Sequence, residues 1–305
     1  MGHKRRVVFL RSTIPFTTAE YYFRALKQLD VDLVDVPFNP HEPRKDLDVP
    51  EGDLILLVDC GVPVEIPALD GCRSPKGYVS IDSCHKAAIH KAYCAKYRFD
   101  YIWVAQKHMV AELGPNARWI PLAADPEVHV YRPEARTEEG FLKRLLKPRV
   151  CDIGMCGAPY KHRRRFEKLF RKAGLKTNFY YRKKFGAEAV SEYGRCTIGF
   201  NVGAGFTGEK GKDINMRVFE TMANGHAMLL TNVYDGLGYE ELFEEGRHYV
   251  TFRTEQEAVE KAVYYSRHPS EALRIAREGQ RHILSGHTYL HRCKELLSVI
   301  GYADD

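Results

Sequence analysis

The chain has 305 residues, of which 44% are hydrophobic and 28% charged, values that exclude a mainly disordered or fibrous protein. This length predicts two domains, because a typical domain has about 150 residues. Lys and Arg number 46 against 40 Asp and Glu, and the net charge of +6 permits an anionic partner without identifying one.

The sequence has no apolar run long enough for a membrane span. Its basic start is followed by only four apolar residues, 7–10, too few for a secretory signal. Eight cysteines occur within expected strands and helices rather than in a dense framework, which favours a reducing compartment. We therefore expect a cytoplasmic protein.

Apolar strands alternate with helices in the first half of the chain, a pattern typical of a parallel sheet covered on both faces. Strands are expected at 7–10, 53–59, 77–81, 101–105 and 118–122, and helices at 18–29 and 84–97. The proline-containing segment 126–148 then includes a charged helical stretch at 137–147. We interpret it as the connection between two domains.

The same alternation restarts in the second half. Strands are expected at 150–156, 177–181, 196–202, 227–231 and 248–252, and helices at 163–173, 216–224, 255–268, 270–284 and 289–300. Parallel α/β sheets bind ligands outside the carboxyl ends of their strands. The loops that follow the strands are therefore the first places to look for function.

The most informative stretch is 213–231, which reads as a loop, a helix, a glycine and an apolar strand. Arg217 and Glu220 are three residues apart, so they share one face of the helix. A carboxylate at the start of such a helix can accept two hydrogen bonds from a ribose diol. A simple surface ion pair is the alternative.

This stretch resembles the donor-binding helix of GT-B glycosyltransferases, and in particular the CgeB-like, spore-maturation-type family. That family's pattern, Asn-x-Arg-x-Phe-Glu-x-x-Ala-x-Gly, is matched by Asn215, Arg217, Phe219, Glu220, Ala223 and Gly225. Further similarity extends over roughly residues 50 to 300, including 100–106, 120–126, 153–164 and 286–292. Several motifs in the same order are more specific than one.

The resemblance implies an α/β fold of the GT-B class, with two Rossmann-like domains whose parallel sheets face each other across a cleft. We expect an acceptor-side domain at 1–135, a linker helix at 136–148, a nucleotide-sugar-binding domain at 149–287 and a C-terminal helix at 288–305 that packs back across the domain junction. The implied enzyme is a hexosyltransferase that moves a sugar from a nucleotide sugar, most often a UDP-sugar, to an acceptor hydroxyl. It would use no metal ion and no permanently bound cofactor.

The resemblance also implies roles in donor binding. Glu220 would bind the ribose, the arginines Arg163, Arg164 and Arg217 the diphosphate, and the glycine-rich loop 203–211, with Gly205, the sugar. The other expected donor-site residues are Gly157, Tyr160, Asp213, Asn215 and Phe219. Retaining relatives often have a second acid eight positions before the ribose-binding glutamate. Lys212 stands there, beside Asp213, so the stereochemistry and the role of Asp213 stay open.

The basic excess is concentrated in one part of the chain. The net charge is +1 over residues 1–148, +10 over 149–217 and −5 over 218–305. The +10 segment contains the loops expected to face the donor diphosphate, which predicts a local phosphate site. The alternative for the basic excess is that it binds a nucleic-acid acceptor, and a solvated face is the simplest interpretation of each basic run. A surface glycan is the other acceptor that we consider.

Acceptor-side chemistry is expected in the first domain. Asp59 ends one expected strand and Asp82 and His85 follow another, and one of the three could be the general base for the acceptor hydroxyl. The alternative for Asp82 is an N-cap of the next helix, a role that Ser83 could also fill. A zinc site is disfavoured, because Cys60, Cys72, Cys84 and Cys94, near His85 and His90, include no Cys-x-x-Cys.

A second functional class stays open beside the transferase. The chain could be a non-catalytic nucleotide-sugar-binding or structural protein that keeps the GT-B fold. The lysine at position 212, where an acid is usual, favours this alternative. The sequence identifies neither the acceptor nor the oligomeric state.

Overall fold

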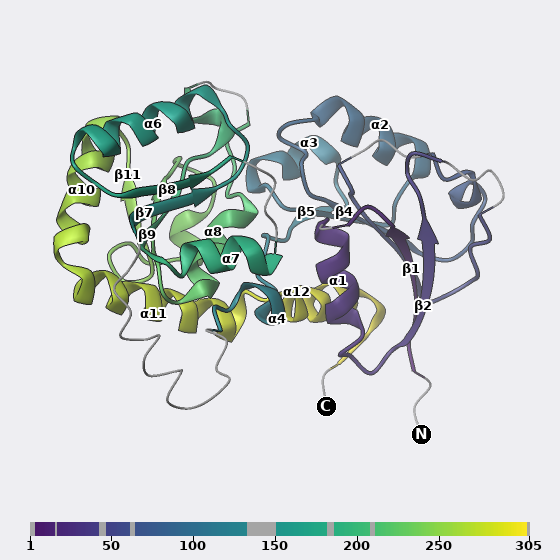
Figure 1. The fold of residues 1–305 in the computed structure, drawn as a ribbon. Coiled ribbons are helices and arrows are strands. Elements are labelled where there is room, and N and C mark those ends of the chain that lie inside the picture. Colours follow the sequence, from purple (N-terminus) through teal and green to yellow (C-terminus); the bar gives the residue numbers. More distant parts are fainter. Residues whose placement is uncertain are drawn as a thin grey trace. The chain divides into compact units, whose positions relative to one another are not determined.

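The computed structural model describes residues 4–15, 17–42, 47–61, 65–132, 151–181, 186–207 and 211–303. The chain forms two compact units, Met1–Leu122 with Tyr289–Asp305, and Ala123–Thr288 (Figure 1). Residues 123–132 thus belong to the second unit, although the sequence placed the end of the first domain at 135. The expected linker helix at 136–148 lies outside the described residues.

The first unit contains a parallel six-stranded sheet in the order β2-β1-β3-β4-β5-β6. Its strands are β1 (Arg6–Ser12), β2 (Asp32–Phe38), β3 (Leu54–Val58), β4 (Lys76–Ser80), β5 (Tyr101–Val104) and β6 (Ala117–Trp119). Strand β3 is buried throughout. The sequence prediction missed β2, an edge strand with mixed exposure that contains Pro37, a residue tolerated only at sheet edges.

Helices cover both faces of this sheet (Figure 1). Helix α1 (Thr18–Leu26) packs with α12 (Tyr289–Leu297), which continues into a 3₁₀ turn, η4 (Ser298–Ile300). The ring of Tyr289 stacks on Tyr21, with centroids 5.4 Å apart. Buried Arg292 donates from Nε to the Pro121 carbonyl at 2.8 Å, which anchors the last helix to the first unit. The remaining helices are η1 (Pro67–Leu69), α2 (Ala87–Tyr97), η2 (Lys107–Met109) and α3 (Val110–Leu113).

The second unit contains a parallel five-stranded sheet in the order β11-β10-β9-β7-β8. Its strands are β7 (Cys151–Cys156), β8 (Thr177–Tyr180), β9 (Cys196–Asn201), β10 (Met228–Asn232) and β11 (Val250–Phe252). Its helices are α4 (Pro126–His129), α6 (Lys161–Lys172), α7 (Gly186–Tyr193), η3 (Ala204–Thr207), α8 (Met216–Asn224), α9 (Tyr239–Leu242), α10 (Glu255–Arg267) and α11 (Pro269–Gly286).

Helices α6 and α10 pack on one face of the second sheet, and α7 and α8 on the other (Figure 1). Phenylalanines from α6 and from strands β9 and β11 fill the space under the first pair, with Phe166 and Phe200 in contact at 5.1 Å. The sequence prediction did not include α7, which has only two turns. It also omitted α4 and α9, which have four residues each.

The two sheets have the same connectivity. Each begins with a central strand, places the second strand on one side and adds the third and later strands on the other. The chain therefore changes direction between β1 and β3 in the first unit and between β7 and β9 in the second. Ligands of doubly wound sheets bind at this point, outside the carboxyl ends of the two strands.

A disulfide joins Cys151 and Cys196, which are register partners on β7 and β9. This pairing differs from the expectation of cysteines suited to a reducing compartment. The sequence did not predict this pairing, because 45 residues separate the two cysteines. Among the described residues, none of the helices is long and apolar enough to cross a membrane.

Helix α8 is held at both ends. Asn215 caps its start by accepting a hydrogen bond from the Arg217 amide at 3.1 Å. At its end, Gly225 adopts φ 73°, and the Gln280 amide donates to the carbonyls of Ala223 and Asn224. The helix also lies directly on the sheet, since a Cβ on Gly199 would be 2.3 Å from Thr221 Cγ2.

Candidate functional site

The loop after β7 begins with Gly157, at the point where the second sheet changes direction. Gly157 has φ 155°, which side chains rarely allow, and its amide donates to the Tyr180 carbonyl at 3.0 Å. A methyl group added there would lie 2.8 Å from Arg163 Nη1 and 2.9 Å from Arg217 Nη2. Two guanidinium groups therefore converge on one stretch of bare backbone.

Hydrogen bonds hold the Arg163 side chain against this loop. Its side chain is 4% exposed, and Nε and Nη2 donate to the Val202 carbonyl at 3.2 and 3.0 Å. Nη1 donates to the Ala158 carbonyl at 3.2 Å. Arg163 thus ties the start of α6 to the ends of β7 and β9, and it supplies buried positive charge beside Gly157.

Arg217 reaches the same glycine from the first turn of α8. The free amides at the start of a helix carry partial positive charge and point toward any anion placed there. The α6 helix also starts beside Gly157, with Tyr160 as its N-cap residue. Two arginines and the starts of two helices give this part of the second unit the groups that favour an anion.

Glu220 lies one turn further along α8, and its side chain is 15% exposed. Its Oε1 is 3.6 Å from Nε2 of His129, a buried residue of α4. The His129 Nδ1 accepts a hydrogen bond from the Asp125 amide at 2.9 Å. The Glu220 carboxylate and the Arg217 guanidinium therefore lie on the same helix, as the sequence predicted.

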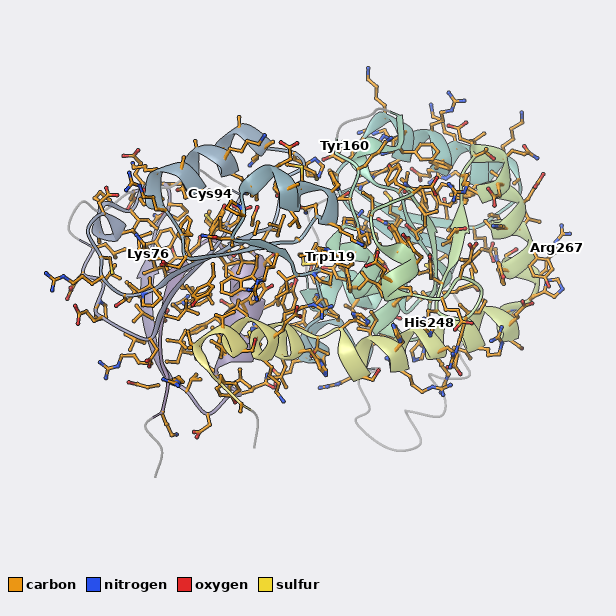
Figure 2. All side chains as sticks on the ribbon, turned by 180° about the vertical axis from the view of Figure 1, so that it is seen from behind. Lys76, Cys94, Trp119, Tyr160, His248 and Arg267 are labelled. Atoms are coloured by element: carbon orange, nitrogen blue, oxygen red, sulfur yellow. A yellow bond between two sulfur atoms is a disulfide. The ribbon has the colours of Figure 1, made fainter. Side chains whose placement is uncertain are left out.

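The other expected donor-site residues are distributed around this centre. Tyr160 is 45% exposed, labelled in Figure 2, with the Arg163 guanidinium over its ring. Gly205 is buried in η3, the described part of the glycine-rich loop, whose residues 208–210 lie outside the described ranges. Asp213 is buried near Gly203, where an added Cβ would be 3.7 Å from Asp213 Oδ1.

Three of the expected donor-site residues make other contacts within the second unit. Asn215 uses its side-chain oxygen to cap α8. Phe219 is fully buried against Phe243, with centroids 5.5 Å apart, so it belongs to the core. Arg164 is exposed and lies over Tyr181, rather than beside Gly157.

In the first unit, Asp59 organises the ends of β3 and β4. Its Oδ1 accepts from the Gly61 amide at 2.8 Å and its Oδ2 from the Asp82 amide at 3.2 Å. His90 Nε2 lies 3.6 Å from Oδ2, and His90 Nδ1 is 2.9 Å from both Tyr78 Oη and Ser80 Oγ. Asp82 is partly exposed and His85 is exposed.

The alternative N-cap role of Asp82 or Ser83 is wrong. Helix α2 begins at Ala87, and its N-cap residue is Lys86. The Asp82 carbonyl instead accepts from the amides of His85 and Lys86 in a turn, and Ser83 Oγ donates to Gln106 Oε1 at 2.7 Å. The predicted helix started too early because this turn shares its apolar spacing.

The cysteines considered for zinc pack against the core of the first unit. Burial raises the pKa of Cys94 to about 11, which favours the thiol over the metal-binding thiolate. His90, which was considered with them, is hydrogen-bonded to Tyr78 and Ser80.

Three functional candidates were missed by sequence reasoning. His129 contacts Glu220 only through the tertiary fold, and His90 was considered only as a zinc ligand. Asn232 is the last residue of β10, and its side-chain oxygen accepts from the Gly203 amide at 2.9 Å, which positions the loop after β9. For His129, the one local signal was the Asp-Pro-x-x-His spacing, in which Asp125 caps a short helix.

Comparison with known families decides the assignment of the chain. Residues 136–298 match the glycosyl transferase-like family. The chain belongs to this family. The narrower CgeB-like resemblance stays a proposal. A comparison with curated protein sequences gives no significant match.

Solved structures share the fold at low identity. The structure of Anabaena Alr3699/HepE in complex with UDP and glucose has 12% identity and a TM-score of 0.60, covering 97% of this chain and 99% of that one. Sucrose-phosphate synthase from Thermosynechococcus elongatus has 10% identity and a TM-score of 0.62, covering 97% and 98%. A glycosyltransferase from Rickettsia africae ESF-5 has 10% identity and a TM-score of 0.61, and the match covers 98% of each chain. The expected GT-B fold class is confirmed.

Proposed function

We propose that this glycosyltransferase family member transfers a hexose from a UDP-sugar to an acceptor hydroxyl, and that the second unit binds the donor. The observation that carries the proposal is the convergence of Arg163 and Arg217 on Gly157, one helical turn from Glu220. Cations and amides suit a diphosphate, and a carboxylate suits a ribose diol. A uridine nucleotide is favoured because the similar HepE structures contain UDP or UDP-glucose.

Transfer leaves a nucleoside diphosphate, so negative charge grows on the leaving group as the glycosidic bond to phosphate breaks. Arg217, Arg163 and the start of α8 are placed to stabilise that charge where it develops. Because these groups are cationic, we propose that transfer needs no divalent metal. Transfer that continues at the same rate with a chelator present is the expected result, and loss of transfer that added Mg²⁺ restores would contradict it.

On the acceptor side, the structure divides the three candidates by environment. Both carboxylate oxygens of Asp59 accept hydrogen bonds from backbone amides, so its proposed role is to hold the loop after β4 in place. Asp82 and His85, which are accessible, are the proposed general bases. A base must come within hydrogen-bond distance of the hydroxyl proton, which favours side chains that an acceptor can reach from solvent.

The acceptor is proposed to be a hydroxyl of a glycan or of a modified base in nucleic acid. Several basic residues of the +10 segment are paired locally. Arg165 contacts Glu255 at 2.8 Å, and Arg195 lies 3.5 Å from Glu192. This pairing reduces the charge available to a phosphate backbone. Binding of duplex DNA that falls steeply with salt would support the nucleic-acid acceptor.

The deciding experiment measures UDP binding by calorimetry for the unmodified chain, Glu220→Ala and the control Glu260→Ala. Glu260 is an exposed glutamate on α10, where its carboxylate accepts from Gln256. We expect at least tenfold weaker UDP binding for Glu220→Ala and no change for the control. Equal affinities would refute the site. UDP binding without transfer or donor hydrolysis would instead indicate a binding protein.

A further inference from the structure

We propose that His129 is a positioning residue that holds the Glu220 carboxylate ready to bind the ribose diol. The inference deepens the proposed function and rests on it. His129 comes from α4 and Glu220 from α8, and both helices belong to the second unit. The imidazole Nε2 lies 3.6 Å from Glu220 Oε1.

The hydrogen bond on the far side of the ring determines which nitrogen carries the proton. The Asp125 amide can only donate, and it lies 2.9 Å from His129 Nδ1. Nδ1 is therefore the acceptor and carries no proton. In the neutral ring the proton must then sit on Nε2, the atom that faces Glu220.

The surroundings of His129 fix the ring before any ligand arrives. Its side chain is 1% exposed. Asp125, whose amide contacts the ring, also caps α4 by accepting from the Glu127 amide at 2.9 Å, and Pro126 occupies the first position of that helix. Helix α4 packs against α7 and α8. The imidazole is thus held by its own short helix.

This arrangement suits a carboxylate that must receive two hydroxyl groups. A glutamate that nothing holds samples many rotamers, and immobilising it on binding reduces the affinity for the ligand. A carboxylate has about four acceptor sites. The His129 N–H, whose nitrogen lies 3.6 Å from Oε1, attracts the carboxylate electrostatically and leaves its acceptor sites for both ribose hydroxyls.

Two substitutions at one position separate the roles of the two ring nitrogens. In His129→Gln, the amide nitrogen takes the place of Nε2 and can still donate to Glu220. In His129→Asn, the shorter side chain can still accept from the Asp125 amide, but it does not reach Glu220. The probes are UDP and 2′,3′-dideoxy-UDP, which differ only in the ribose hydroxyls.

We expect the unmodified protein to prefer UDP over the dideoxy nucleotide, with the preference reduced about tenfold in His129→Asn and retained in His129→Gln. Affinity for the dideoxy nucleotide should be the same in all three proteins. Equal losses for both nucleotides in His129→Asn would show a merely structural role and overturn the inference. An unmodified protein without any preference would overturn the ribose role of Glu220, and this inference with it.

A measurement on the unliganded protein does not depend on the variants folding. With ¹⁵N-labelled histidine, the nitrogen spectrum distinguishes a protonated ring nitrogen from an unprotonated one. We expect His129 to show protonated Nε2 and unprotonated Nδ1 at neutral pH. A proton on Nδ1 would overturn the inference even if nucleotide binding behaved as expected.

Discussion

The guanidinium groups of Arg163 and Arg217 meet at Gly157, one from the first turn of α6 and the other from the first turn of α8. A methyl group on Gly157 would approach both Nη atoms to less than 3 Å. Arg163 cannot easily move away, because three hydrogen bonds to the carbonyls of Ala158 and Val202 hold it. The glycine is thus part of the proposed diphosphate site although it has no side chain.

Replacing Gly157 by alanine should therefore damage the site more than the fold. The added methyl group crowds the guanidinium groups of both Arg163 and Arg217 and forces at least one of them to move. We expect at least tenfold weaker UDP binding, measured by calorimetry.

Gly236→Ala provides the control for backbone strain. Gly236 has φ 76°, and a Cβ there would have no heavy atom within 4 Å. This variant should lose about 1 kcal/mol of stability and bind UDP normally. If Gly157→Ala binds UDP as well as Gly236→Ala does, the two arginines do not form the diphosphate site.

The two arginines should respond differently to substitution by methionine. Arg163→Met removes the donors to the buried Val202 carbonyl and the partly buried Ala158 carbonyl, which should cost about 1–3 kcal/mol of unfolding free energy in a denaturant titration. Arg217→Met should lower affinity for UDP about tenfold and leave affinity for uridine unchanged, because its proposed partner is the diphosphate. A parallel loss for uridine would place Arg217 away from the phosphates.

Acid should destabilise the first unit through His90. Burial, the largest cause, lowers the pKa of His90 from its ordinary value near 6.5, Lys86 lowers it further, and Asp59 opposes them. The unfolded chain therefore takes up a proton at a higher pH than the folded chain does. Stability is fully present above about pH 6.5 and is lost as the pH falls below that value.

The measurement for His90 is the thermal midpoint at pH 7.5 and pH 5.5, together with the ring titration by NMR. His90→Gln should show a smaller fall between the two pH values than the unmodified protein shows. A folded-state pKa at or above 6.5 in the NMR titration would contradict the expected sign.

Reduction of the Cys151–Cys196 disulfide should lower the thermal midpoint. The bond closes a loop of 45 residues, for which chain entropy gives an upper limit of about 4 kcal/mol. The double variant Cys151→Ser with Cys196→Ser should unfold at a lower temperature, and a reducing agent should leave its midpoint unchanged. A reductant that shifts both proteins equally would place the effect at another site.

The sequence pattern predicted both ends of α8 correctly. The rest of the candidate site depends on contacts between distant segments, which the sequence pattern does not show. Asn215 before the helix and Gly225 after it mark both ends within the sequence itself. The buried strands were also visible as apolar runs. Strand β2 was missed because its proline and its alternating exposure resemble a loop.

The contact of His129 with Glu220, and the convergence of two helices on Gly157, depend on how distant segments pack. No local pattern encodes such a contact. Sequence reasoning could therefore nominate Arg163 and Arg217 separately, but it could not show that Arg163 is bound to backbone while Arg217 reaches the glycine from another helix. The structural role of Phe219 was hidden for the same reason.

Helix α8, which is held at both ends, also fixes the spacing between two of the proposed donor-binding residues. Because Asn215 and Gln280 fix its two ends, the offset between Arg217 and Glu220 is set by the helical rise, about 4.5 Å along the axis for three residues. One residue inserted between them would rotate one relative to the other by about 100° and take it off the shared face. This helix should therefore accept many changes of side chain and no change of length.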